Sequence, residues 1–118
     1  MRFSFVRGRA RLPEYFEEHL LTRLGFALDR FRPRLLAVAV RVDDLNGPRG
    51  GTDQLCRIRV HVRGAGEVVA EDRAPDLVTA ADRAVDRVRY AVSRAIEKLK
   101  VRPRSGRDRR HAGTYVPA

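Results

Sequence analysis

A regularly spaced row of basic residues near the C-terminal end is the part of this sequence best suited to binding chemistry. Its members follow one another at steps of four, three, four and four residues, which brings them to one face of a helix. Arginine binds phosphate through parallel hydrogen bonds, and a tyrosine ring in such a row offers a stacking surface to an unpaired base. We interpret this row as a candidate RNA-binding surface. The row consists of Arg83, Arg87, Tyr90, Arg94 and Lys98.

An ordinary solvated helix face is the alternative interpretation of the same row. Asp82 and Asp86 lie beside it in the sequence and could form salt bridges with its arginines. Such pairing would leave little positive charge for a ligand. The sequence alone leaves both interpretations open.

A second row alternates with apolar residues along an expected strand. Cys56, Ile58, Val60 and Val62 occupy one face of this strand, and the second row occupies the other. The row could contact nucleic acid, although it lacks the aromatic residues that RNA-binding sheets normally use. A merely charged, solubilising face is the alternative. The second row consists of Arg57, Arg59, His61 and Arg63.

The composition favours a polyanionic partner. The 118 residues include 25 Lys and Arg against 15 Asp and Glu, which gives a net charge of +10 and a pI near 11.2. Nucleic acid is the first class of partner that such a charge attracts, and an acidic membrane is the second. No apolar run approaches the roughly 20 residues of a membrane span, and no signal peptide is visible. We therefore expect a cytoplasmic protein without a membrane partner.

The residues that could support catalysis are scattered. His19, His61 and His111 lack the spacing of metal ligands, and Cys56 is expected to be a small buried hydrophobic residue. No nucleophile, base and metal ligand can be assembled from these positions. We expect no catalytic activity, no metal, no cofactor and no small-molecule substrate.

The first half of the chain predicts a strand, a helix and a second strand. A short strand at Phe3–Val6 precedes a helix that has Pro13 in its first turn and is stopped by Pro33. The second strand runs from about Leu35 to Asp44. The apolar residues expected to face the core are Phe16, Leu20, Leu24, Ala27 and Phe31 on the helix, and Leu36, Val38, Val40 and Val42 on the strand.

The second half predicts a hairpin and a long helix. A tight turn at 64–66 joins the third strand to a fourth that ends near Ala74, and Asp76 is a plausible N-cap. Residues 102–118 are rich in arginine and contain proline, glycine and serine, which predicts a basic tail, disordered or partly ordered, after a domain at 1–101. The apolar face of the long helix comprises Leu77, Ala81, Ala84, Val88, Ala91, Val92, Ala95 and Leu99.

The resulting order is β-α-β-β-β-α, which predicts an α+β fold. Antiparallel strands joined by hairpins and two amphipathic helices each have one apolar face to bury. We therefore expect a four-stranded sheet with two helices packed on one face.

Two stretches of the sequence, the run at 76–88 and the loop at 44–51, together resemble the ribosome hibernation promoting factor and ribosome-associated inhibitor family, in its short form. The run Asp-Leu-Val-Thr-Ala-Ala-Asp at 76–82, continuing through Asp86-Arg87-Val88, is similar to the start of that family's second helix. The usual run there is Asp-Leu-Tyr-Ala-Ala-Ile-Asp. The loop at 44–51, with Cys56-Arg57 after it, is similar to short family members. The resemblance covers roughly residues 2–100, including the order of the elements.

The resemblance implies a fold related to double-stranded-RNA-binding domains and a particular partner. Family members bind the small ribosomal subunit and its rRNA near the decoding region, which holds ribosomes inactive under stress. Arg87 and Arg23 match basic positions of the second and first helices. Val78 stands where the family usually has tyrosine, and Tyr90 stands where many members have arginine.

The first helix also departs from the family pattern. Phe26 and Leu28 lie where this helix is generally polar, and with Leu21 they predict an apolar patch that faces a protein partner. Partial burial against the sheet or the tail is the alternative.

These observations predict a non-catalytic factor that binds the ribosome and blocks translation by occupancy under stress. The alternative is a protein-interaction or regulatory module that uses the apolar patch of the first helix.

Overall fold

The structure, a computed structural model, describes residues 2–8, 10, 12–45 and 53–101. The predicted tail at 102–118 lies outside the described residues. The elements in chain order are β1 (Arg2–Arg7), α1 (Phe16–Leu28), a 3-10 helix η1 (Asp29–Arg34), β2 (Leu35–Asp44), β3 (Gln54–Val62), β4 (Gly66–Ala74) and α2 (Leu77–Val101).

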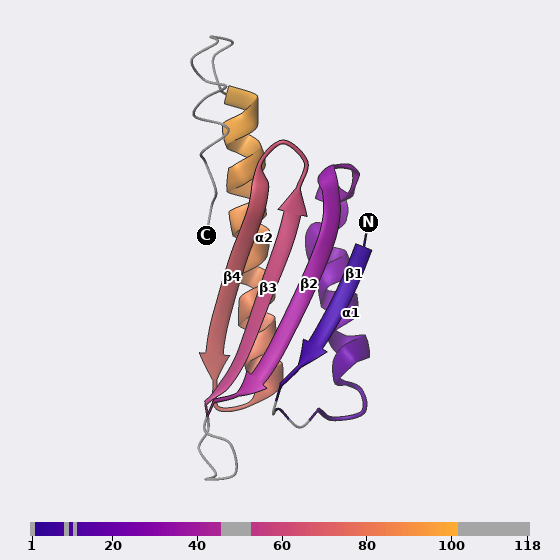
Figure 1. The fold of residues 1–118 in the computed structure, drawn as a ribbon, viewed down its shortest axis with the longest axis vertical. Helices are drawn as coiled ribbons and strands as arrows, with labels where there is room; N and C mark the ends of the chain where they lie inside the picture. Colours follow the sequence, from indigo (N-terminus) through magenta and orange to yellow (C-terminus); the bar gives the residue numbers. More distant parts are fainter. Residues whose placement is uncertain (1, 9, 11, 46–52, 102–118) are drawn as a thin grey trace.

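The four strands form one sheet in the order β1-β2-β3-β4. β1 runs parallel to β2, and the other neighbours are antiparallel. Both helices lie on the same face of the sheet, α1 behind β1 and β2, and α2 behind β3 and β4 (Figure 1). None of the described elements covers the opposite face. The predicted α+β fold, its element order and its one-sided helix layer are therefore confirmed.

The core lies between the sheet and the two helices, as the apolar periodicity predicts. Phe16 and Leu20 of α1 are fully buried, and so are Ile58 and Val60 of β3. The alternation along β3 is confirmed, because Cys56 and Val62 are also inaccessible to solvent. On α2 the buried stripe is wider than predicted, since Ala80, Val85 and Ile96 join it.

One expected core residue of β2 is exposed. Leu36 was predicted to share the buried face with Val38, but 38% of its surface is accessible and Leu35 is buried instead. A β-bulge between Leu35 and Ala37 inserts an extra residue opposite β3. Because side chains alternate with period two, the insertion moves Leu36 to the other face.

Helix α1 begins and ends differently from the prediction. It begins at Phe16 rather than near Pro13, whose carbonyl accepts a hydrogen bond from the Phe16 N–H at 3.0 Å. At Leu28 the chain continues into η1, which contains Pro33. The proline is tolerated there because the 3-10 turn ends one residue later, so little regular structure depends on its missing N–H.

The hairpin and the start of α2 follow the sequence closely. Gly64 and Gly66 adopt φ of 83° and 84°, a region that L-residues with a side chain rarely occupy. The Asp76 carboxylate accepts hydrogen bonds from the Thr79 N–H at 2.9 Å and the Thr79 hydroxyl at 2.8 Å. The predicted N-cap is thus confirmed, and these bonds, the backbone one first, lower the pKa of Asp76.

Among the described residues, no helix combines the length and the apolarity that a membrane crossing needs.

Candidate nucleic-acid interface

The α2 row lies on the solvent side of the helix. All five of its side chains are exposed, and the row runs opposite the buried stripe of α2. For brevity we call Arg83, Arg87, Tyr90, Arg94 and Lys98 the α2 row.

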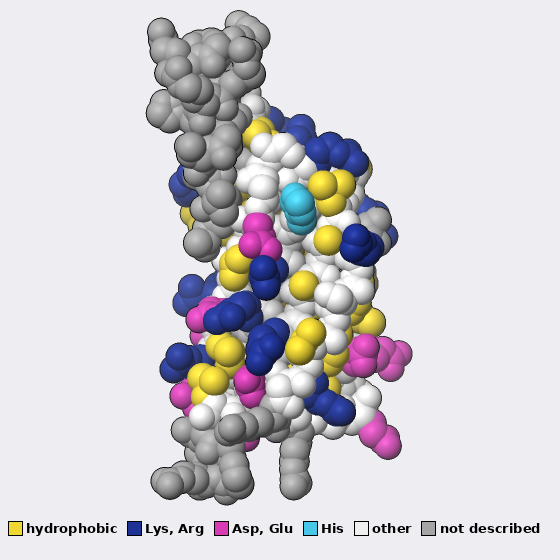
Figure 2. Space-filling view, viewed as in Figure 1, with side chains coloured by type: hydrophobic (Ala, Val, Ile, Leu, Met, Phe, Trp, Pro, Cys, Tyr) yellow, Lys and Arg dark blue, Asp and Glu magenta, His cyan; other side chains and the backbone are white. Residues whose placement is uncertain are grey.

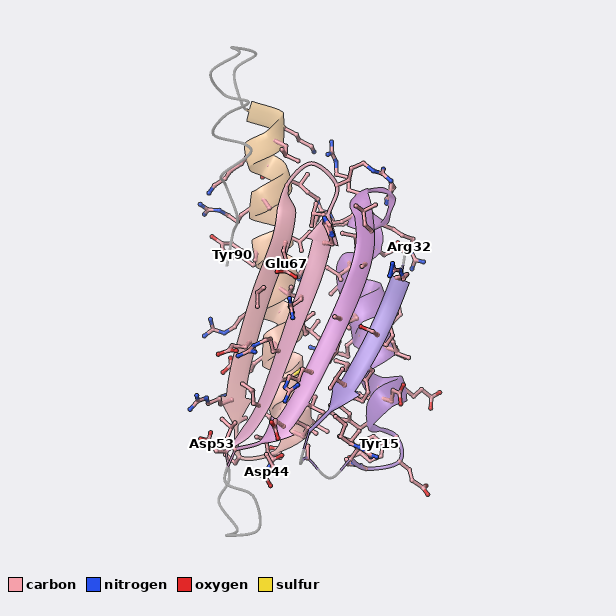
Figure 3. All side chains as sticks on the ribbon, viewed as in Figure 1. Tyr15, Arg32, Asp44, Asp53, Glu67 and Tyr90 are labelled. Atoms are coloured by element: carbon pink, nitrogen blue, oxygen red, sulfur yellow. The ribbon has the colours of Figure 1, made fainter. Side chains whose placement is uncertain are left out.

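Tyr90 and Arg94 are ordered against one another. The Arg94 guanidinium lies 5.6 Å from the centre of the Tyr90 ring and donates a hydrogen bond of 3.0 Å to the Tyr90 hydroxyl. Tyr90 remains 62% exposed and projects past the outer edge of β4 (Figure 3). A cation beside an open aromatic face is a suitable arrangement for a stacked base with an adjacent phosphate.

The two acids beside the α2 row do not neutralise it. Asp82 contacts the His19 ring nitrogen at 3.0 Å and the Arg23 Nε at 3.3 Å, and Asp86 lies 3.8 Å from an Arg23 terminal nitrogen. Both carboxylates therefore point toward α1. The solvated-face interpretation, which paired them with Arg83 and Arg87, is wrong in its choice of partners.

The same contacts change the interpretation of Arg23. Its side chain, 41% exposed, bridges Asp82 and Asp86 across the helix pair. Two carboxylates thus satisfy the guanidinium that the family resemblance implied as a basic contact. Arg23 serves first to join α1 to α2.

Arg87 has a carboxylate partner, which lies on β4. Its Nε donates to Asp72 at 2.9 Å. Burial alone would raise the pKa of Asp72, but the Arg87 hydrogen bond and a bond from the Arg73 N–H outweigh it and lower that pKa. Arg83 donates only to the Arg73 carbonyl, at 3.4 Å. Within the described residues no carboxylate forms a salt bridge with Arg83 or Arg94, so these two remain available to an anion.

The row on the uncovered sheet face is neutralised by β4. Arg57 pairs with Glu71 at 2.7 Å, and Arg59 pairs with Glu67 at 3.1 Å. Basic and acidic side chains accordingly lie side by side over β3 and β4 (Figure 2). This pairing favours the solubilising interpretation for the sheet row over direct contact with a polyanion.

The sequence predicted that Arg63 continues this row, and that prediction is wrong. β3 ends at Val62, and Arg63 lies in the turn, where its guanidinium donates to the Pro33 carbonyl at 3.0 Å. Its backbone N–H bonds to the Arg34 carbonyl at 2.7 Å. Arg63 therefore ties the hairpin to η1. His61 is exposed at the end of the sheet row.

An open groove of about 750 Å³ connects the two rows around the edge of β4. Arg57 and Arg59 contribute from the sheet side, and Arg87 and Tyr90 from α2. Sequence reasoning treated the two rows as separate and did not identify the acids of β4. These acids could have been found from the antiparallel register of the hairpin, because that register sets Glu71 directly opposite Arg57.

The predicted apolar patch on α1 is only partly present. Leu21 is 41% exposed and Phe26 is 82% exposed, but Leu28 is 5% exposed and belongs to the core. The partial-burial alternative therefore holds for Leu28.

Cys56 is also buried, as predicted, and burial raises the pKa of its thiol to about 12.

Comparisons with known structures identify the fold. The chain is similar to the N-terminal domain of Thermus thermophilus Protein Y, with a TM-score of 0.65 and 24% identity, over 80% of this chain and 98% of that one. It is also similar to a ribosomal subunit interface protein from Coxiella burnetii, with a TM-score of 0.68 and 11% identity, over 83% of this chain and 100% of that one. No curated protein sequence matches the chain.

A family match covers most of the sequence. Residues 6–100, which include both rows and every strand except the start of β1, match a single family model. This match agrees with the resemblance to ribosome hibernation factors that the sequence itself carries. The chain therefore belongs to the family described as Sigma 54 modulation protein / S30EA ribosomal protein.

Proposed function

We propose that this protein is a ribosome-binding translation inhibitor that occupies the decoding region of the small subunit under stress, without catalysing a reaction. Membership of its family makes it a ribosome-associated modulation protein. The finer statement rests chiefly on one observation. Arg83 and Arg94 lie on the same exposed face of α2 as Tyr90, while Asp82 and Asp86 of that helix contact α1.

Phosphate contacts supply the affinity in this proposal. Arg83 and Arg94 bind rRNA phosphates, and Tyr90 stacks on an unpaired base. Each neutralised phosphate releases counterions, so binding weakens steeply as salt is added. Translation stops because the protein occupies space that messenger and transfer RNA need. The basic residues of 102–118 extend the same electrostatic attraction.

A protein-interaction module is the second candidate function. The observation that favours it is the 82% exposure of Phe26, since a large exposed aromatic side chain is a common feature of binding surfaces. Binding through such a surface depends weakly on salt, whereas binding through phosphate contacts depends strongly on it.

Co-sedimentation of the full chain with ribosomes and with separated subunits, across a salt series, tests the proposal. We expect saturable association with the small subunit and a steep loss of affinity with salt. The test variant is Arg83→Gln/Arg94→Gln, which removes the two arginines of the α2 row that form no salt bridge among the described residues. Its matched control is Arg57→Gln/Glu71→Gln, which removes a salt bridge from the sheet and leaves the net charge unchanged.

The two variants give distinct results under the proposal. The α2 variant loses most of its association, and the sheet variant keeps it. Absence of small-subunit binding by the wild-type chain at low salt would contradict the proposal. Equal loss in both variants would show that binding is not specific to the α2 row, because the sheet variant leaves the net charge unchanged.

A further inference from the structure

The outer edge of β1 is available to an additional strand. Gly8 donates its N–H to the Val42 carbonyl at 2.8 Å, which fixes the phase of hydrogen bonding between β1 and β2. In a parallel pair, alternate residues direct both backbone groups to the same neighbour. The backbone groups of Phe3, Phe5 and Arg7 therefore point away from the sheet. This edge is distinct from the α2 row, which lies beside β4 at the opposite edge.

An apolar groove lies directly beneath this edge. It has a volume of about 210 Å³ and separates β1 from α1. Leu24 and Leu28 lie buried beneath it, and the partly exposed Phe3 and Leu21 form its sides. Gly25 also lines it, and a Cβ at that position would meet no atom within 4 Å. The groove therefore has room for a side chain from a neighbouring strand.

The side chains of β1 suit such a strand on both faces of the sheet. Phe3 pairs in register with Val38 and so faces the groove, whereas Val6 pairs with Arg41 and faces the uncovered side. Val6 is 48% exposed. An added strand would cover apolar surface on each face with alternate residues.

The charges around the edge determine which partner fits. Arg2 and Arg7 lie at the two ends of β1, both exposed, and Arg32 lies beside its start (Figure 3). A second copy pairing through β1 would bring a second Arg2, Arg7 and Arg32 to the same edge, and like charges brought close together destabilise a strand pair. Nucleic acid suits the groove poorly, because it offers neither strand hydrogen bonding nor alternating apolar side chains.

We propose that β1 and the groove bind an extended segment of a partner protein, with acidic residues at its ends and alternating apolar residues between them. The segment adds a fifth strand to the sheet, and one of its apolar side chains enters the groove beside Gly25. The acidic ends pair with Arg2, Arg7 and Arg32. This surface is separate from the proposed ribosome contact and does not depend on it.

The test uses a fluorescein-labelled peptide that alternates valine and threonine between pairs of glutamates. Fluorescence anisotropy measures its binding to the full chain. The test variant is Gly25→Leu, which fills the groove, and the matched control is Gly25→Ala, which does not. Both substitutions remove a helix-interior glycine, so the thermal midpoint of unfolding should rise in both, and lost binding cannot reflect lost folding.

We expect the wild-type and Gly25→Ala chains to bind the peptide with equal affinity. Gly25→Leu should bind it at least about tenfold more weakly. Methylation of alternate peptide nitrogens, or exchange of the glutamates for lysines, should abolish binding. Hydrogen exchange should slow at the amides of Phe3, Phe5 and Arg7 in the complex.

Three outcomes would overturn the proposal: no saturable binding at millimolar peptide, equal binding by Gly25→Leu, or displacement of the peptide by an oligouridine RNA. Ribosome co-sedimentation of Gly25→Leu should match the wild type. A failure of this proposal is therefore distinguishable from a failure of the ribosome proposal.

Discussion

The two arginine rows on either side of β4 are similar in sequence and different in charge. On the sheet, Arg57 and Arg59 each face a glutamate of β4 at salt-bridge distance. On α2, the neighbouring aspartates are engaged with α1, and Arg83 and Arg94 form no salt bridge with a carboxylate among the described residues. A row of arginines is therefore a candidate anion site only where the fold directs the acids elsewhere.

The counts of charged residues alone understate this difference. α2 holds six basic and three acidic residues, and the hairpin from Gln54 to Ala74 holds four and three. All three acids of the hairpin form salt bridges with arginines of the two rows. Two of the three acids of α2 join the helices instead. Placement, more than number, separates the two surfaces.

Removal of the two arginines of the α2 row that form no salt bridge among the described residues should have the largest effect. We expect Arg83→Gln/Arg94→Gln to weaken ribosome binding by about 3 kcal/mol, or roughly 100-fold, since each charged hydrogen bond contributes about 1.5 kcal/mol or more. The slope of log affinity against log salt should fall by about 1.6, for two lost phosphate contacts. Filter binding across a salt series measures both quantities. An unchanged slope would mean that these arginines do not contact phosphate.

Tyr90 tests whether the α2 row offers more than charge. Tyr90→Ala should weaken binding by about 1–2 kcal/mol through loss of a stacked base, while Tyr90→Phe should retain nearly all affinity. Equilibrium binding to ribosomes at fixed salt measures the difference. Equal losses in the two variants would assign the effect to the hydroxyl that accepts the Arg94 hydrogen bond.

Removal of the glutamates that pair with the sheet row should make the sheet surface more similar to the α2 row in its affinity for RNA. Glu67→Gln/Glu71→Gln frees Arg59 and Arg57, so affinity for RNA should rise by about 1 kcal/mol and the salt slope should steepen. The cost in stability should stay below about 1 kcal/mol, because both salt bridges are largely exposed. Binding and urea unfolding are measured on the same preparation. A gain in binding no larger than that of a distant Glu17→Gln/Glu18→Gln control would contradict local masking.

Asp82 tests whether the acids of α2 serve the fold. Asp82→Asn removes a carboxylate from both His19 and Arg23, and we expect a loss of at most about 1 kcal/mol in unfolding free energy, since all three side chains are partly exposed. Chemical denaturation measures this loss, and ribosome binding should change little. A large change in binding with unchanged stability would show that Asp82 affects ribosome binding by the α2 row rather than the packing of the helices.

Cys56 lies on the buried side of β3, opposite the exposed sheet row, and its burial makes the stability of the core depend on pH. An unfolded thiol ionises near pH 9.0, while burial delays ionisation in the folded chain to about pH 12. The unfolded state therefore binds fewer protons in this window, and stability falls as pH rises through it, by at most about 1.4 kcal/mol per unit. Denaturation at several pH values, compared with Cys56→Val, measures this contribution. Rapid labelling of the native thiol would contradict its burial.

The sequence by itself determined the local periodic features. Alternation assigned the two faces of β3, amphipathic spacing assigned the buried stripe and the exposed row of α2, and Asp76 marked the N-cap. These features depend on neighbours within a few residues, which a sequence displays directly. The family resemblance added the identity of the fold.

Only the tertiary structure decided which charges are neutralised and which apolar residues are covered. Arg57 meets Glu71 through strand register, Asp82 meets Arg23 through helix docking, and Leu36 is exposed by a single bulge. Each outcome depends on groups far apart in the chain or on a shift of one residue in register. Periodicity reports the face on which a side chain lies, and packing alone reports what meets it there.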